Sequence, residues 1–350
     1  MKKPVRQLLD WYEINRRILP WREDPSPYHV WISEIMLQQT RVETVKPYYA
    51  RFLKALPDIC ALAGVADDDL MKLWEGLGYY SRARNLKRAA QMILRDCGGE
   101  MPAFPGELMK LPGIGSYTAG AIASIAYGGA YPAVDGNAMR IWTRVRADSR
   151  DIGKAGTKRA IEEEIAAVLP ETPFDAGRFN QALMDLGTAV CLPNSAPRCP
   201  ECPWKDNCRA HRDGCETEFP VKAGRKPRRI EERTILLIED NGSVLIRKRP
   251  EQGLLAGLYE LPGLSGHLSE SQVLSWCRKQ GVEAIRIRPL PAAKHIFTHI
   301  EWHMRGYLIH VDALSDFVPG KLDGIMADKR AISTRYSIPS AFSNYILYIT

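Results

Sequence analysis

The spacing of apolar residues changes part-way along the 350-residue chain, and this change constrains the fold more than any other feature. As far as about residue 215, apolar residues recur every three or four positions, which is typical of helices that bury one face. From Thr234 the sequence reads TILLIED-NG-SVLIRKR, and two apolar runs around an Asn-Gly pair predict a β-hairpin. The length allows two or three domains, so we expect a helical region followed by a separate α+β domain.

Both regions are predicted in more detail from their periodicity and from the Gly, Pro and Asp residues that interrupt it. In the helical region, residues 1–220, helices are expected over 28–38, 68–77, 83–93, 117–126, 138–145, 158–168 and 176–190. In the second domain, residues 234–350, further strands are expected over 283–288, 295–297 and 302–311, with one helix near 271–280. Residues 221–233 carry six basic residues, one Pro and one Gly, which predicts an exposed linker. This linker is either a solvated tether or an arm that contacts phosphates.

The formal net charge of +7 suits an acidic partner such as nucleic acid, although many proteins without such a partner are equally basic. The longest uncharged stretch, Ser116–Val134, is rich in Gly and Ala and is interrupted by Pro132. A buried helix followed by a loop explains it better than a membrane span does. The N-terminal MKKPVRQLLDWYE lacks the apolar run of a secretory signal, so we expect a cytoplasmic protein with no membrane partner.

Four of the eight cysteines crowd into one segment with the spacing C-x7-C-x2-C-x5-C: Cys191, Cys199, Cys202 and Cys208. Without an export signal, a metal or cluster site is a better explanation than a disulfide framework. Zinc sites more often pair two C-x2-C units, whereas a [4Fe–4S] cluster takes four cysteines at uneven spacing. The spacing favours the cluster and leaves zinc open. Three other cysteines are expected to be inert core thiols: Cys60, Cys97 and Cys277.

The stretch LPGIGSYTAG, Leu111–Gly120, is typical of a glycine turn that leads into a small-residue helix. Gly113 and Gly115 permit a left-handed backbone and a close approach of another group, and Ser116 is a suitable N-cap. Backbone N–H groups at such a helix start form an anion site, so a phosphate fits here. A tight helix–helix turn with no ligand explains the stretch equally well.

Two carboxyl groups stand out by their sequence context. Glu34, in VWISEIMLQQ, lies on a largely apolar helix, where burial would raise its pKa and suit a general acid; the alternative is an exposed stripe shared with Gln38. Asp135, in YPAVDGNAMR, precedes a helix whose dipole would keep it ionised; the alternative is an ordinary helix cap. A pair in opposite protonation states is what cleavage of a glycosidic bond requires.

LPGIG followed by a helix and then by VDGN resembles the helix-hairpin-helix DNA glycosylases, whose cysteine-rich loop also resembles residues 191–208. Longer segments resemble the MutY-type adenine DNA glycosylase family over nearly the whole chain: WISEIMLQQTRV, GLGYYSRARNL, FNQALMDLG and RPEQGLLAGLYELPG. The resemblance implies a six-helix barrel with a [4Fe–4S] cluster domain, joined to a small α+β Nudix-like domain. The first cysteine gap holds seven residues instead of the family's usual six, which an outward bulge of the loop would accommodate.

The resemblance also implies a monofunctional enzyme of base excision repair. It would flip out an adenine that is paired with 8-oxoguanine or guanine in double-stranded DNA, and break the bond between the base and its sugar. Glu34 would protonate the adenine ring and help to activate water, and Asp135 would stabilise the positively charged sugar or attack it transiently. Tyr117 stands where the lyase branch of the family has a nucleophilic Lys, and Tyr cannot form a Schiff base. Its hydroxyl would instead hold Asp135 or the sugar.

By the same resemblance, further side chains contact DNA. Thr40 is one of these DNA-binding residues. Gln39 and Tyr79 would wedge into the base stack and offset the cost of unstacking. The adenine pocket would be lined by Arg22, Asn137 and Gln181. From the residues alone, Tyr79 is either a core aromatic or a DNA contact, and its Gly-rich, Arg-flanked setting favours DNA. We expect the enzyme to act as a monomer.

The second domain resembles the Nudix-like domain of the family, and its FTH segment, Phe297–His299, matches the motif that reads oxidised guanine. The Thr298 hydroxyl would bind a base edge, and His299 would contact base or phosphate. From the residues alone, a hairpin tip with a packed Phe297 is the simpler explanation. Pyrophosphate hydrolysis is not expected, because LPGLSGHLSESQVLSWCRKQG has Glu270 as its one acid and lacks a metal-binding RExxEE run.

Two other functions stay open at the level of sequence. One is an endonuclease III-like glycosylase/lyase for oxidised pyrimidines, which would use a Lys nucleophile and would leave the second domain unexplained. The other is a non-catalytic iron–sulfur DNA-binding protein, which would have no need of Glu34 and Asp135 together.

Overall fold

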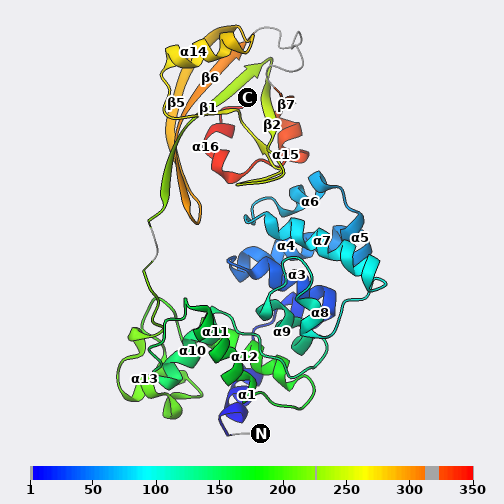
Figure 1. Cartoon of the computed structure of the whole chain (residues 1–350), viewed down its shortest axis with the longest axis vertical. Helices are drawn as coiled ribbons and strands as arrows, with labels where there is room; N and C mark the ends of the chain where they lie inside the picture. Colours follow the sequence, from blue (N-terminus) through cyan, green and yellow to red (C-terminus); the bar gives the residue numbers. More distant parts are fainter. Residues whose placement is uncertain (1–2, 225–226, 312–322, 350) are drawn as a thin grey trace. The chain divides into compact units, whose positions relative to one another are not determined.

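The computed structural model describes residues 3–224, 227–311 and 323–349. The chain forms two compact units (Figure 1). The first unit contains Met1–Val65 and Arg84–Gly224, and the second contains Ala66–Ala83 and Arg225–Thr350. Within the described residues, no helix combines the length and the apolar character that crossing a membrane requires.

The first unit is helical, as its periodicity predicts. Each helix expected within it forms, and its ends lie within three residues of those expected. The helices that matter for the site are α1 (Lys3–Asn15), α2 (Pro20–Glu23), α3 (Pro27–Leu37), α4 (Val42–Ala55), α9 (Ser116–Ile125), α10 (Gly136–Arg146) and α12 (Asp175–Ala189). The others are α5 (Ile59–Gly64), α8 (Pro105–Leu108), α11 (Ala155–Ala166) and α13 (Arg209–Arg212), while α7 (Ser81–Asp96) begins in the second unit and continues into the first.

A hydrophobic core between α1, α10 and α12 supports one side of the site. Leu8, Ile141 and Phe179 come from these three helices and are at most 2% exposed. Burying one such side chain stabilises the fold by about 1.5–3 kcal/mol. Cys191 and Cys202 pack against the same core, so the cysteine-rich loop is anchored on the helices that carry the site.

Helix α3 packs between α4 and α9. Eight of its eleven residues are buried, including Trp31 and Glu34. A helix that is apolar around most of its circumference is a core helix, so the expected apolar setting of Glu34 is observed.

The second unit is built on a seven-stranded mixed sheet. Its strands are β1 (Arg229–Asp240), β2 (Ser243–Lys248), β3 (Tyr259–Glu260), β4 (Gly263–Ser265), β5 (Ala284–Ile296), β6 (Ile300–Val311) and β7 (Ile325–Asp328). The order is β3-β2-β1-β6-β5, with β4 paired to β1 and β7 to β2, and β1 runs parallel to β6. The tight turn between β1 and β2 is the expected Asn-Gly pair, Asn241 and Gly242, with φ of 46° and 78°.

Helices cover both faces of this sheet. Val273 of α14 (Glu270–Lys279) packs in one buried cluster with Leu236, and Trp302 packs in another with Phe342 and Tyr345 near the chain end. The remaining helices of the unit are α6 (Asp67–Trp74), α15 (Lys329–Thr334) and α16 (Ser343–Ile346). Because alternate residues of a strand point to opposite faces, Leu236 and Leu237 belong to different clusters.

Three sequence expectations of the fold change on the structure. The helical region expected over residues 1–220 does not include Ala66–Ala83, which belong to the second compact unit. Strand β1 begins at Arg229, so the last residues of the expected linker, 229–233, pair with β6 instead of tethering the domains. Cys60 and Cys97 are exposed rather than buried in the core, whereas Cys277 is buried as expected. Cys60 lies on an exposed position of the short helix α5, and Cys97 follows the end of α7, so apolar neighbours in the sequence were a poor guide to burial there.

Candidate active site

A cavity of about 1140 Å³ in the first unit is lined by both carboxyl groups that the sequence singled out, Glu34 and Asp135. Its walls come from α2, α3, α9, α10 and α12. Of the other predicted site residues, it is also lined by Arg22, Gln39, Thr40, Tyr117, Asn137 and Gln181. The volume is ample for one extruded nucleotide, since ligand pockets usually measure about 300–1000 Å³.

Glu34 is only 5% exposed. Burial raises its pKa to about 7, and this effect outweighs a hydrogen bond from Tyr117, which lowers the pKa. Near neutral pH a substantial fraction of this carboxyl group is therefore protonated, which suits a proton donor. The raised pKa agrees with the sequence expectation, and the observed burial excludes the alternative of an exposed stripe.

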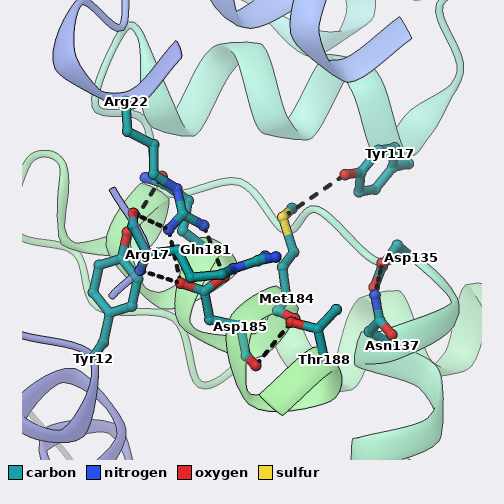
Figure 2. Close-up of polar contacts among 10 residues, drawn as sticks. All are labelled: Tyr12, Arg17, Arg22, Tyr117, Asp135, Asn137, Gln181, Met184, Asp185 and Thr188. Carbon is teal, nitrogen blue, oxygen red and sulfur yellow. Dashed lines mark hydrogen bonds and ion pairs between the residues drawn. The ribbon is translucent and has the colours of Figure 1, made fainter. Parts of the chain in front are cut away.

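Tyr117 stands in the first turn of α9, and its hydroxyl donates a hydrogen bond of 2.5 Å to Oε2 of Glu34. The resemblance implies that this hydroxyl holds Asp135 or the sugar, whereas the carboxyl group that it contacts in the structure is Glu34. Burial and the nearby carboxyl groups raise the pKa of Tyr117 well above its usual value, which keeps the phenol protonated as a donor. The same hydroxyl lies 3.8 Å from Sδ of Met184 (Figure 2).

Asp135 is the N-cap of α10, and both of its oxygens accept hydrogen bonds. One accepts from the Ala138 backbone N–H at 2.7 Å, and the other from Nδ2 of Asn137 at 2.7 Å (Figure 2). Burial raises the pKa of Asp135, while these donors lower it. The pKa values of the two carboxyl groups are thus both raised, and their opposite protonation states stay a prediction. Asp135 still has more donors that favour its charged form than Glu34 has.

Arg140 links Asp135 to the cysteine-rich loop, a connection that the sequence did not predict. Its Nη2 donates to Oδ1 of Asn137 at 2.9 Å, and its Nε donates to the Cys191 carbonyl oxygen at 2.9 Å. Gly187 of α12 lies close by: a Cβ atom there would come within 2.6 Å of the Cβ of Asn137. Asn137, on α10, is therefore packed against α12 and hydrogen-bonded to Arg140. In this fixed position it orients the carboxylate of Asp135.

A second polar network on the cavity wall surrounds Asp185 of α12 (Figure 2). Asp185 is 1% exposed and accepts two hydrogen bonds from Arg22, at 2.7 and 3.1 Å. Arg17 donates to the same carboxylate through Nε at 2.8 Å. Gln181, one turn earlier on α12, accepts a hydrogen bond from the Tyr12 hydroxyl at 3.3 Å. Two cations on one buried carboxylate fix the guanidinium of Arg22 at the cavity wall.

The sequence reasoning missed Asp185, Arg17 and Tyr12. The available signal was an acid four residues after Gln181, on the same face of a helix whose neighbours are apolar. Trp21, in contrast, behaves as a core residue: it is 6% exposed and packs edge-on against Tyr49.

Both residues expected to wedge into DNA have left-handed backbones, an uncommon and strained state for a residue with a side chain. Gln39 follows α3 with φ of 61°, and Tyr79 follows α6 with φ of 47°. Tyr79 belongs to the second unit and is 46% exposed, so the alternative of a core aromatic is excluded.

The glycine turn has a structural role for one of its two glycines. Gly113 has φ of 82°, and a Cβ atom there would lie 2.9 Å from the Cβ of Asn85. Gly115 has an ordinary φ and is itself the N-cap of α9, with open space where a Cβ would stand. The expected N-cap, Ser116, is therefore the first residue of the helix instead. Its hydroxyl donates to Glu162 at 2.9 Å. The open space at Gly115 leaves the backbone at the helix start accessible.

The cysteine-rich loop brings all four predicted ligands together around one small cavity: Cys191, Cys199, Cys202 and Cys208. Burial raises the pKa of the Cys202 thiol to about 11 and that of Cys199 to about 12. Nearby thiols raise both pKa values further. Forming thiolates here is therefore unfavourable by itself, and a bound metal cation would stabilise them. Arg144 donates to Sγ of Cys191 at 3.2 Å.

His211 and Glu216, which the sequence analysis did not single out, face the same cavity and form a 2.7 Å contact. Their ligand atoms and Sγ of Cys199 all lie within 4.8 Å of one another. The loop is therefore a cysteine-rich site with further metal-binding groups beside it.

The FTH segment forms the loop between β5 and β6. Phe297 packs edge-on against Trp302, with ring centroids 4.9 Å apart. Thr298 and His299 are exposed, and Oγ1 of Thr298 lies 3.2 Å from the Tyr79 hydroxyl. The Phe297 side chain thus anchors the loop, while the two polar residues lie on its exposed side.

Two family models match separate parts of the chain. Residues 32–167 match the HhH-GPD superfamily of base excision DNA repair proteins, and residues 233–347 match the NUDIX domain. The adenine DNA glycosylase of Mus musculus is 35% identical, and the match covers 87% of this chain and 70% of the mouse protein. The adenine DNA glycosylase of Buchnera aphidicola subsp. Baizongia pistaciae (strain Bp) is 33% identical over 89% of this chain and 87% of its own length. The chain belongs to the adenine DNA glycosylase family.

Solved structures show the same fold for the helical part. A thermostable thymine-DNA glycosylase has 27% sequence identity and a TM-score of 0.53, covering 60% of this chain and 95% of that one. Endonuclease III in a non-covalent DNA complex has 24% identity and a TM-score of 0.51, covering 61% of this chain and 99% of its own. The predicted fold, a helical glycosylase region joined to a small Nudix-like domain, is confirmed.

Membership of the adenine DNA glycosylase family makes this chain a DNA glycosylase of base excision repair. The endonuclease III-like alternative is not favoured, because the curated relatives that match most of this chain are adenine DNA glycosylases. The non-catalytic alternative fails for the same reason. The roles of individual residues remain predictions.

Proposed function

We propose that this chain hydrolyses the N-glycosidic bond of adenine that is paired with 8-oxoguanine or guanine in double-stranded DNA. One observation carries the proposal: buried Glu34, which accepts a hydrogen bond from Tyr117, lines the same cavity as Asp135, the N-cap of α10. The adenine DNA glycosylases of mouse and Buchnera support adenine as the excised base. The chemistry follows from the two carboxyl groups and their different partners.

In the first step, the carboxylic acid of Glu34 transfers its proton to a ring nitrogen of the flipped adenine. The C1′–N9 bond then breaks, its electron pair leaves with the neutral base, and the sugar becomes an oxocarbenium ion. The Asp135 carboxylate stabilises this cation, or bonds to it transiently. Water adds to C1′ and loses a proton to the Glu34 carboxylate, which restores the enzyme.

The adenine pocket contains side chains with both donors and acceptors. The Arg22 guanidinium is fixed by Asp185, and Gln181 carries an amide that can donate to a ring nitrogen and accept from the exocyclic amine. Asn137 orients Asp135 from the other wall. Gln39 and Thr40 enter the vacated base stack, and the accessible backbone at Gly113–Gly115 binds a phosphate.

Tyr117 supports hydrolysis without strand cleavage. A lyase of this fold would need an amine at this helix start to form a Schiff base. The phenol of Tyr117 instead donates to Glu34 and lowers its pKa relative to burial alone. Incubation with a thymine-glycol duplex and borohydride should therefore trap no covalent adduct.

The four cysteine thiols fit a [4Fe–4S] cluster, because they line one cavity at the uneven spacing that such clusters tolerate. Cys191, Cys199, Cys202 and Cys208 would hold it, and Arg144 would donate to one of the sulfurs. When bound, the cluster supplies a rigid crosslink for the loop. We expect about four irons per chain, measured by metal analysis of purified protein; stoichiometric zinc in colourless protein would overturn this assignment.

The second domain, residues 234–350, is proposed to recognise the lesion, while residues 1–220 carry out the chemistry; of the expected basic linker, residues 229–233 form the start of β1 instead. Exposed Thr298 and His299 present a hydroxyl and an imidazole to the 8-oxoguanine opposite the excised adenine, with Phe297 as their anchor. The protein would act as a monomer.

The decisive test is Glu34→Gln, which keeps the shape of the side chain and removes the proton donor. Adenine release from an A:8-oxoguanine duplex under single-turnover conditions should fall by about 10²–10⁴-fold, with DNA affinity largely unchanged. Glu163→Gln, at an exposed position of α11, is the matched control and should keep full activity. Undiminished adenine release by Glu34→Gln would refute the proposed role.

A further inference from the structure

Helix α6 comes from the N-terminal third of the sequence, yet it lies in the same compact unit as the mixed sheet. Three acidic or basic side chains on or just after α6 contact the C-terminal part of the chain: Asp68, Lys72 and Glu75. Their contacts lie at both ends of the helix, so they define its orientation against the sheet.

At the C-terminal end of α6, Lys72 contacts the loop after α15. Its ammonium group donates to the carbonyl oxygens of Ile332 at 3.1 Å and Tyr336 at 3.3 Å, and it pairs with Glu75 at 2.6 Å. The last carbonyl groups of a helix lack partners within that helix and carry partial negative charge. Lys72 therefore satisfies the end of α15, and its side chain is only 20% exposed.

Two further hydrogen bonds join the C-terminal end of α6 to the segment after α15. Glu75 accepts from the Ile338 backbone N–H at 3.1 Å. The Ser337 hydroxyl donates to the Met71 carbonyl oxygen at 2.9 Å, and Ser337 is 2% exposed. Removing a partner from such a shielded contact leaves polar groups without compensation, which is why these bonds define the docked position.

At the N-terminal end of α6, Asp68 contacts the sheet itself. It pairs with Lys248 of β2 at 2.7 Å and accepts from the Tyr259 hydroxyl of β3 at 3.1 Å. Asp68 and Lys248 are each 41% exposed, so this ion pair contributes less than the contacts of Lys72.

The turn that presents Tyr79 starts where α6 ends. Gly78 and Tyr79 both have left-handed backbones, with φ of 68° and 47°. Nε1 of Trp74 donates to the Gly78 carbonyl oxygen at 3.1 Å, and Nη2 of Arg82 donates to it at 3.2 Å. The Arg82 guanidinium also lies over the Tyr79 ring, 5.6 Å from its centroid. The position of α6 therefore sets the position of Tyr79.

We propose that α6 is a docking helix that fixes the Tyr79 wedge beside the Thr298 reader loop, so that the two form one lesion-reading surface. The 3.2 Å contact between the Tyr79 and Thr298 hydroxyl groups is the product of this docking. Rigid placement of both side chains before DNA binds lowers the entropy cost of ordering them on the lesion. This inference rests on the proposed function, and it assigns a positioning role to Lys72, Glu75 and Asp68.

The test is Lys72→Met, which keeps the alkyl stem and removes the donors. Single-turnover adenine release is measured on A:8-oxoguanine and A:G duplexes with enzyme in excess over DNA but below saturation, and the ratio of the two rates is compared. We expect the ratio to fall about tenfold, mainly through the A:8-oxoguanine arm. Lys279→Met, at an exposed position in the last turn of α14, removes the same charge and should leave the ratio unchanged.

Hydrogen exchange gives a readout that does not depend on catalysis. Amides in residues 70–78 and 332–338 should exchange faster in Lys72→Met than in Lys279→Met, since the docked contacts that bury them are weakened. Unchanged exchange, or faster exchange with an unchanged rate ratio, would overturn the proposal.

A second pair of variants covers the case in which Lys72→Met does not fold. Asp68→Asn removes the ion pair with Lys248, while Asp69→Asn makes the same charge change on the next, exposed residue of the same helix turn. Asp68→Asn should lower the 8-oxoguanine preference by about two- to threefold, and Asp69→Asn should not. Equal ratios for both would also overturn the proposal. If the unmodified chain released no adenine from either duplex, the proposed function itself would fail, whatever these variants did.

Discussion

Glu34 in the first unit is 5% exposed and has a pKa raised to about 7, whereas Thr298 in the second unit is exposed and lies at the tip of a hairpin. The first environment suits chemistry, because removing water from a carboxyl group is what shifts its pKa. The second suits recognition, because an exposed hydroxyl can reach a base edge. Changes in the cavity should therefore alter rate and pH dependence, while changes in the loop should alter substrate preference alone.

The largest effect is expected for Asp135→Asn. The variant loses the negative charge that stabilises the oxocarbenium ion, while Asn can still cap α10. Adenine release should fall by about 10³-fold or more on A:8-oxoguanine and A:G alike, measured in single-turnover assays. A loss of activity confined to one of the two duplexes would contradict the division between chemistry in the cavity and recognition in the loop, because it would give the cavity a role in recognising the opposite base.

Glu34 should also make stability depend on pH. Its pKa is about 7 in the folded state against an ordinary value of 4.5, so its contribution to the free energy of unfolding is fully present below pH 4.5 and is lost as pH rises through 7. The loss corresponds to roughly 3 kcal/mol for a shift of this size. Glu34→Gln should be the more stable form at pH 8, with the advantage vanishing near pH 4.5, in denaturant titrations of the intact chain. Equal stability of the two proteins at pH 8 would contradict the raised pKa.

Tyr117→Phe should move the pH dependence of catalysis. The hydroxyl lowers the pKa of Glu34, so its removal should raise that pKa further. Activity requires protonated Glu34 and should decline as pH rises past about 7 in the unmodified chain; in the variant this decline should occur at higher pH. The rate profile from pH 5.5 to 9 measures the shift, and a decline at lower pH than in the unmodified chain would contradict it.

The smallest effect is expected for Thr298→Val, which keeps the shape and removes the hydroxyl. Its loss should lower the preference for A:8-oxoguanine over A:G by about three- to tenfold, with the A:G rate itself unchanged. Competition between the two duplexes in one reaction measures the preference directly. An equal loss on both duplexes would show that the loop acts through general DNA affinity instead of reading the lesion.

Much of this molecule could be predicted from local sequence. The helical period of residues 28–38 predicts α3, and the apolar neighbours of Glu34 predict its burial and raised pKa. The Asn-Gly pair predicts the turn between β1 and β2. Cysteine spacing predicts a shared site for four thiols that do line one cavity. Each of these predictions rests on neighbours within about one helical turn or one hairpin.

Other features depend on contacts between distant segments. The bond from Tyr117 to Glu34, the carboxylate of Asp185 between two arginines, and the link from Arg140 to Cys191 join residues 51–168 positions apart. Local composition does not indicate such partners, so the hydrogen bond from Tyr117 to Glu34 was not among the expectations, which named Asp135 or the sugar.

Local sequence is enough to predict two domains of different periodicity, a buried acid on an apolar helix, a capping aspartate and a cluster of four cysteines, because hydrophobic spacing and local hydrogen bonding are properties of neighbouring residues. Packing between distant segments sets which groups share the cavity, raises the pKa of Asp135 as well as that of Glu34, and groups α6 with the mixed sheet. Burial and long-range hydrogen bonds exist only once the distant segments have packed together, and they set these properties.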